Sequence, residues 1–138
     1  MNVLAVSALR VEVRPRLGLV RLVDQLAIAT DIGLRLNVPT DFWSDGASVP
    51  APLWAVLSAS PIQLLVMGAA HDAAYRSDAR WTMADSSKRP ITRPEADDLA
   101  RALALWSGCS ALDGAKVRWG LGVGGASSWH RKRLGWRP

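Results

Sequence analysis

Alternating apolar and polar positions mark the first part of the chain. In LRVEVRP, Val11 and Val13 fall on one face of an extended strand and charged residues fall on the other. Two more apolar stretches, LVRLVDQLAIAT and GLRLNVP, lie on either side of an Asp-Ile-Gly turn signal at residues 31–33. Pro39 ends this pattern, because proline cannot donate to a sheet. We therefore expect a small antiparallel sheet or hairpin within residues 10–40.

The next stretch, TDFWSDGASVPAPLW, predicts a long loop. It mixes prolines, a glycine and aspartates in a way that no regular element tolerates. Loops of this size are more often functional than idle. Two of its residues are candidate site elements: Gly46, which allows close backbone approach, and Ser48. Either Ser48 or Asp45 is expected to cap the following turn.

Helical spacing begins near residue 53. A short helix is expected over Leu53–Leu57, and a second begins with Ser60 as N-cap and Pro61 in the first turn. This second helix extends to about Ser77. Its expected inward residues are Ile62, Leu65, Val66 and Ala69. Residues 78–91 look polar and irregular.

A third helix is predicted in TRPEADDLARALALW. Thr92 and Glu95 have capping-box spacing at its start. Its expected apolar stripe consists of Ala96, Leu99, Leu103 and Trp106. A last helix begins near Ser110. It is rich in glycine, so it is either weak or packed very closely against a neighbour.

These elements define an α+β fold: a small N-terminal antiparallel sheet, a long loop and three to four helices. The length of 138 residues and a hydrophobic content of 49% are typical of one domain with a real core. Its parts are a sheet (1–40), a motif loop (41–52), a helical part (53–126) and a basic tail (127–138). No apolar run approaches the ~20 residues of a membrane span, so no transmembrane segment is expected.

The charge suits an acidic partner, and it equally suits a solvated surface with spare arginines. The net charge is +5, with basic residues gathered between tryptophans in the terminal stretch WHRKRLGWRP. The candidate partner-binding residues there are Trp129, Arg131, Lys132, Arg133 and Trp136. The tail either docks on this domain, on a partner protein or a second copy, or on an anionic envelope surface, or it is a frayed terminus. No sequence-specific nucleic-acid binding is expected, because no such motif is present.

The stretch GAAHDAAYRS holds the strongest candidate chemistry. His71 and Tyr75 lie one helical turn apart, and Asp72 is rotated by about 100° from His71. Asp97 lies at the edge of the next helix's apolar stripe, where the two helices should meet, so we expect it to contact His71. A histidine beside a carboxylate can be a general base or a metal ligand, or a mere surface or capping feature. Asp45 in the loop is a further candidate ligand.

The order of these motifs resembles a known family. The segments VPTDFWSDGASVPAPLW, HDAAYR and TRPEADDLARAL, within roughly residues 35–105, are similar to the domain of unknown function family 1353 of bacteriophages and prophages. The resemblance implies a phage setting and no assigned chemistry. We therefore expect a structural or assembly protein of the virion, in the tail or its tip. It would be found in the host cytoplasm during assembly and then in the particle.

A second resemblance concerns the catalytic helix of secreted phospholipase A2 enzymes. It implies His71 as base, Asp72 as a calcium ligand with Asp45, Tyr75 as support and Asp97 as the carboxylate that orients the histidine. The chain lacks the family's glycine-rich calcium loop and its disulfides. The alternative function is thus a small metal-assisted hydrolase of phospholipid or peptidoglycan, using calcium or zinc. An open cleft at these residues would favour the hydrolase, and cover by Trp43 or Trp54 would favour a structural lock.

Overall fold

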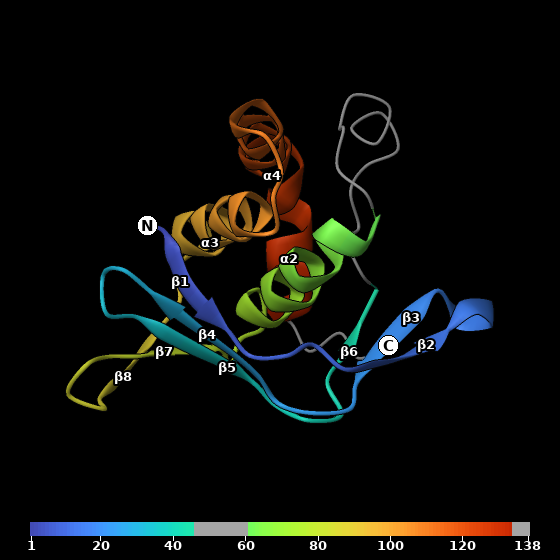
Figure 1. The fold of residues 1–138 in the computed structure, drawn as a ribbon, viewed down its shortest axis with the longest axis horizontal. Helices are drawn as coiled ribbons and strands as arrows, with labels where there is room; N and C mark the ends of the chain where they lie inside the picture. Colours follow the sequence, from blue (N-terminus) through green and yellow to red (C-terminus); the bar gives the residue numbers. More distant parts are fainter. Residues whose placement is uncertain (46–60, 134–138) are drawn as a thin grey trace.

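The computed structural model describes residues 1–45 and 61–133 (Figure 1). The strands are β1 (Val3–Val6), β2 (Val11–Arg14), β3 (Leu19–Leu22), β4 (Leu26–Thr30), β5 (Arg35–Val38), β6 (Trp43–Ser44), β7 (Arg80–Thr82) and β8 (Lys88–Pro90), with a short 3-10 turn, η1 (Pro15–Leu17), between β2 and β3. The helices are α2 (Pro61–Ala74), α3 (Arg93–Trp106) and α4 (Ala111–Arg133). Antiparallel strands that lie mostly before the helices confirm the α+β class.

The strands form two antiparallel sheets. The larger has the order β1-β4-β5-β7-β8, and the smaller has the order β2-β3-β6. The β4–β5 hairpin is the one expected from the sequence, with Ile28 opposite Leu36. Gly33 has a φ of +76° in its turn, a conformation that glycine adopts without strain. β1 was not anticipated, because its four residues carry no alternation that can be told from a loop.

The expectation of an irregular segment at residues 78–91 is wrong. This segment forms the β7–β8 hairpin, which extends the larger sheet at its far edge. Trp81 at its centre is fully buried, and Ser86 in its turn has a φ of +66°. Trp81 is the one buried side chain of the hairpin, Met83 is partly buried against the core, and most other positions are polar. The sequence therefore shows no alternation of apolar and polar residues that would predict these strands. Contacts with the rest of the fold determine the strand structure here.

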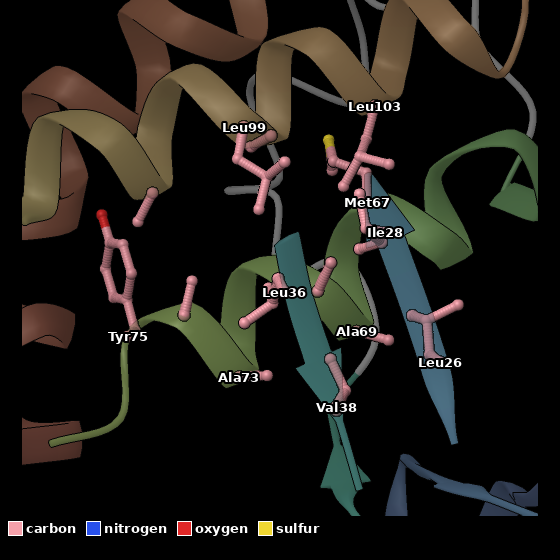
Figure 2. Packing of buried hydrophobic residues seen from close by; sticks show 14 of the residues in the cluster. Leu26, Ile28, Leu36, Val38, Met67, Ala69, Ala73, Tyr75, Leu99 and Leu103 are labelled. Atoms are coloured by element: carbon pink, nitrogen blue, oxygen red, sulfur yellow. The ribbon is translucent and has the colours of Figure 1, made fainter. Parts of the chain in front are cut away.

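The main core lies between the larger sheet and the helices. Figure 2 shows Leu26 and Ile28 of β4 and Leu36 and Val38 of β5 directed towards α2 and α3. The helices contribute, among others, Met67, Ala69, Ala73, Leu99 and Leu103. Burial of these side chains is the main source of stability, at about 25 cal/mol per Å² of apolar surface. The core fixes where α2 and α3 lie relative to each other.

The expected inward face of α2 is only partly correct. Ala69 is buried, but Leu65 and Val66 are half-buried, and Leu64 and Met67 are the buried large residues. The side chain of Ile62 lies outside the described part. Small buried residues occur on several sides of α2. Its sequence therefore has no single apolar stripe that would predict which side of the helix faces the core.

The boundaries of α3 and α4 follow their caps. The Thr92–Glu95 capping box is present, and Ser110 accepts a hydrogen bond from the backbone N–H of Asp113 at 3.1 Å. The expectation that Trp106 is part of the buried stripe is wrong, because this residue ends α3 and is 46% exposed. The other three stripe residues, Ala96, Leu99 and Leu103, are buried.

The last helix is long and closely packed. α4 continues through five glycines to Arg133, so residues 127–133 of the expected tail are helical. A β-carbon at Gly114 would lie 3.0 Å from the side chain of Leu105, which supports close packing. None of the described helices is long and apolar enough to cross a membrane. The expected Leu53–Leu57 helix and the Ser60 cap lie outside the described residues.

A buried aspartate cluster as candidate functional site

Asp97 is the centre of the candidate site. It lies in the second turn of α3 and is only 2% exposed. His71, near the end of α2, places its Nε2 3.3 Å from Oδ1 of Asp97, which confirms the expected contact. Tyr75 follows α2 directly and donates a hydrogen bond from its hydroxyl to the same oxygen at 2.5 Å. The rings of His71 and Tyr75 lie against each other, with centroids 4.0 Å apart. The sequence pattern therefore located three residues that do meet.

Two arginines complete this cluster. The second carboxylate oxygen, Oδ2, lies 3.7 Å from Nε of Arg93 in α3 and 3.7 Å from Nη1 of Arg118 in α4. Arg93 also donates to the backbone carbonyl oxygens of Leu121 and Gly122 in α4, at 3.0 and 2.7 Å. Asp97 is thereby linked to all three described helices. We call Asp97, His71, Tyr75, Arg93 and Arg118 the Asp97 cluster.

Neither arginine was found by the sequence reasoning. Arg93 had a local signal, because it precedes Asp97 by four residues on the same helix, a spacing at which opposite charges meet. Arg118 had none, since nothing in the sequence predicts which face of a glycine-rich helix turns towards α3. Its Nε donates to Asp98 at 2.7 Å, so Arg118 pairs with both aspartates of the Glu-Ala-Asp-Asp stretch.

The environment keeps Asp97 ionised and Tyr75 neutral. Burial alone would raise the pKa of Asp97, but hydrogen bonds from His71 and Tyr75, with the nearby positive charge of Arg93, outweigh it and lower the pKa below its ordinary value. Burial also raises the pKa of Tyr75, and the adjacent negative charge of Asp97 raises it further. The phenol therefore remains a donor to the carboxylate over the whole physiological pH range.

The C-terminal half of α4 covers the tyrosine. Trp129 packs edge-on against the Tyr75 ring, with centroids 4.9 Å apart and an angle of 89°. The expected docking of the basic terminal segment is therefore, for Trp129, a contact within this domain. The cover comes from α4, whereas Trp43 lies elsewhere and Trp54 is outside the described residues. The side chains of Arg131, Lys132 and Arg133, and all of Trp136, also lie outside the described part.

Asp72 serves a different neighbour. Its Oδ2 accepts a hydrogen bond from the hydroxyl of Ser44 in β6 at 2.5 Å, and the carboxylate is buried. Adjacent residues of α2 thus point to two walls, as their 100° rotation implies: His71 to α3 and Asp72 to β6. Asp45 directly follows β6 and is exposed. Gly46 and Ser48, with the capping role expected for Ser48, lie outside the described residues.

The described residues offer little for a metal ion. Within 1–45 and 61–133, no three His, Cys, Asp or Glu side chains are grouped so that they could hold one. Calcium takes six to eight oxygen ligands, and Asp72 and Asp45 supply only part of such a set. At Asp97, Oδ1 is bound by His71 and Tyr75, and Oδ2 lies near two guanidinium groups, which repel a cation.

Comparison with known proteins adds no information about function. No family model matches this chain, and no curated protein or solved structure matches it.

Proposed function

We propose that this chain is a bacteriophage- or prophage-encoded structural or assembly protein of the virion, in the tail or its tip, that docks on partner proteins. One observation carries the structural role: Asp97 is 2% exposed and bound by side chains from three helices. A carboxylate with that many partners holds helices together. We infer that the His-Asp-x-x-Tyr motif acts as a lock that fixes α2, α3 and α4 in one arrangement.

The state of His71 supports a lock better than an active site. A general base must reach a substrate or a water, but the His71 side chain is only 12% exposed. Its partner Asp97 is shared with Tyr75 and two arginines, whereas orienting a histidine requires one carboxylate oxygen. Removing one member of such a network leaves the buried carboxylate with an unpaired oxygen, which costs about 1–3 kcal/mol or more.

The outer face of α4 supports the docking part of the proposal. Leu112, Trp119 and Val123 are 65–68% exposed. Their spacing of seven and four residues places all three within about 40° on one side of the helix. We call these three residues the α4 stripe. A row of large exposed apolar side chains on one element is typical of a surface that another protein covers. The net charge of +5 favours an acidic partner.

The phage setting rests on the resemblance to the domain of unknown function family 1353. The protein would accumulate in the host cytoplasm and enter the particle during assembly. Its partners would be other phage proteins or further copies of itself. Detection of the chain in purified particles from an induced lysogen tests this directly. Its absence from particles, with normal particle formation when the gene is deleted, would contradict the proposal.

The alternative is a small metal-assisted hydrolase of phospholipid or peptidoglycan. The observation that favours it is the His71–Asp97 pair, a histidine nitrogen 3.3 Å from a carboxylate on the neighbouring helix. In that reading Asp97 orients His71, and Tyr75 supports the pair. Calcium or zinc would be held by Asp72 and Asp45, together with further oxygen ligands.

His71→Ala separates the two functions. A lock predicts a lower melting temperature, because Asp97 loses a donor, at a cost of about 1–3 kcal/mol or more. Wild type and variant would be compared by thermal unfolding and assayed on phospholipid vesicles and on peptidoglycan, each with calcium or zinc. The lock also predicts no turnover by either protein. An unchanged melting temperature, together with metal-dependent wild-type turnover that falls by ~10²–10⁴-fold in the variant, would establish the hydrolase instead.

The other histidine provides a matched control. His130 is exposed on α4, so His130→Ala changes the same residue type outside the Asp97 cluster. Its melting temperature should equal that of the wild type. A similar loss in both variants would show that histidine removal in general is harmful, and would contradict a specific lock.

A further inference from the structure

A cavity of about 530 Å³ lies beside the C-terminal end of α2, separate from the Asp97 cluster. β5, the segment that leads to β6, the turn after α2, β7 and β8 all contribute to its wall, and Leu36 and Ala73 supply buried apolar surface. β5 and β7 are paired at a single position, Arg35 with Thr82. The sheet is therefore incompletely closed beside the cavity. Its size suits a ligand of one or two rings.

Three cationic side chains line the cavity from three elements. Arg80 donates Nη1 to the carbonyl oxygens of Ser77 and Ala79 at 2.8 and 2.9 Å, so its guanidinium is held in place by backbone and has no carboxylate partner in the described part of the chain. The ammonium group of Lys88 in β8 makes no hydrogen bond or ion pair with any described residue. Both charges are therefore available to an anion.

Arg76 is the third cation. Its guanidinium carbon lies 5.6 Å from the centre of the Phe42 ring, a cation–π contact that limits its movement. Its Nε is 3.9 Å from Asp78, a carboxylate whose side chain is 83% exposed. So loose and exposed a pair is worth little, which leaves most of the charge of Arg76 to a ligand.

The acidic residues of the wall do not cancel this charge. Asp41 is already paired with Arg21, which is not part of the wall. Of the two carboxylates in the wall, only Asp78 pairs with one of the three cations. Charged donors bind carboxylate or phosphate oxygens more strongly than neutral donors do, and fixed guanidinium groups add directional selectivity. The cavity therefore favours an anionic group.

The remainder of the wall resembles a surface for a sugar ring. Trp43 is half-buried and offers an aromatic surface, while the ring of Phe42 is already engaged by Arg76. Asn37, Thr40 and Thr82 carry side chains that can both donate and accept hydrogen bonds, as sugar hydroxyls require. A single aromatic surface with several neutral hydrogen-bonding groups suits a sugar better than a base that needs an aromatic sandwich.

We propose that this cavity binds a small anionic sugar, with its phosphate or carboxylate held by Arg76, Arg80 and Lys88 and its ring against Trp43. This site goes beyond the proposed structural function and does not depend on it. It would give a particle protein a means to recognise acidic carbohydrate.

Calorimetric titration with matched probes tests the proposal. Glucose, glucose 6-phosphate and glucuronate share one ring and differ only in the acidic group. The two acidic sugars should bind at least about tenfold more tightly than glucose, and their ratio identifies phosphate or carboxylate as the preferred group. Inorganic phosphate should bind more weakly than glucose 6-phosphate. Equal binding of phosphate, tighter binding of adenosine monophosphate, or no binding of either acidic sugar at about 10 mM would overturn the proposal.

Single charge removals locate the binding site. Arg80→Gln and Lys88→Gln should each weaken binding of the acidic sugar by about tenfold and leave the melting temperature unchanged, since both residues are exposed. Arg16→Gln is the matched control, an exposed arginine in η1 outside the cavity. An equal loss in all three variants would show nonspecific charge attraction and would overturn the assignment.

Discussion

Tyr75 and Gly125 approach each other so closely that a β-carbon at position 125 would lie 2.5 Å from the tyrosine hydroxyl oxygen. Real β-carbons essentially never come that near to another heavy atom. Glycine is therefore required at this point of α4, because the helix passes directly over the hydroxyl that donates to Asp97. Glycine lowers the intrinsic stability of a helix, but at position 125 it is what allows α4 to pack against Tyr75.

Gly125→Ala should destabilise the fold by roughly 1–3 kcal/mol, since overpacking a closed contact forces the helix or the tyrosine to move. Gly124→Ala is the neighbouring control. A β-carbon there meets nothing within 4 Å, so the same change should stabilise the protein by up to about 1 kcal/mol through helix propensity. Thermal or urea unfolding would measure both. Stabilisation by both changes would contradict the packing of α4 over Tyr75.

Tyr75→Phe should cost about 1–3 kcal/mol, because Asp97 loses a buried hydrogen bond. The variant also removes the nearest atom to position 125, and the next nearest lie at 3.5 Å. Gly125→Ala should therefore cost less in the phenylalanine background, with a coupling of about 0.5–3 kcal/mol in a double-mutant cycle. Additive effects would mean that the two residues do not share this contact.

The capping box of α3 should make stability depend on acid. The two hydrogen bonds from Arg89 to the Glu95 carboxylate, aided by those from Thr92, lower the pKa of Glu95 from 4.5 to about 2. A carboxyl whose pKa is lowered on folding contributes stability that is complete above its unfolded pKa and is lost as the pH falls through its folded pKa. The contribution of Glu95 should therefore disappear between about pH 4.5 and pH 2.

Melting temperatures of wild type and Glu95→Gln across that pH window would measure this effect. The variant should be less stable at neutral pH and should approach the wild type near pH 2. Arg89→Gln removes the partner and should flatten the same acid dependence. A constant difference between wild type and Glu95→Gln at all pH values would contradict the lowered pKa.

Two tryptophans of α4 should behave in opposite ways. Trp129→Ala should lower stability by roughly 1–3 kcal/mol, because its ring packs on Tyr75. Trp119→Ser should leave the melting temperature unchanged, since Trp119 is exposed in the α4 stripe, but should reduce incorporation into particles. Ile32→Ser, which removes an exposed apolar residue from the β4–β5 turn, is the control. Normal incorporation of the Trp119 variant would exclude the α4 stripe as the docking surface.

Local signals predicted the parts of this fold that are determined locally. The Asp31–Gly33 turn and the Thr92–Glu95 capping box depend on residues close together in the chain, so their sequence patterns were sufficient. The His71–Asp97 contact was also predicted, because the α3 stripe was placed correctly and Asp97 lies at its edge, where α2 was expected to meet it.

The remaining features depend on distant partners. The β7–β8 strands are too short and polar to alternate, and the orientation of α2 is hidden by small residues that are buried on several sides. Arg118 reaches Asp97 only because α4 crosses α3 at that point. The cavity beside α2 combines residues that come before α2 in the sequence with residues that come after it, so no single stretch of sequence predicts it.

The position of the β7–β8 hairpin has a consequence for how the chain acquires its structure. β5 pairs with β7, which follows α2 in the sequence, so the chain passes through α2 before it returns to the sheet (Figure 1). The larger sheet therefore cannot be completed by the first 45 residues alone, and sheet and helix must form in one cooperative event. Pairings between residues far apart in sequence slow folding, because the chain loses the entropy of closing a long loop before the new contacts stabilise it. During synthesis on the ribosome, the N-terminal strands should remain incomplete until the hairpin emerges.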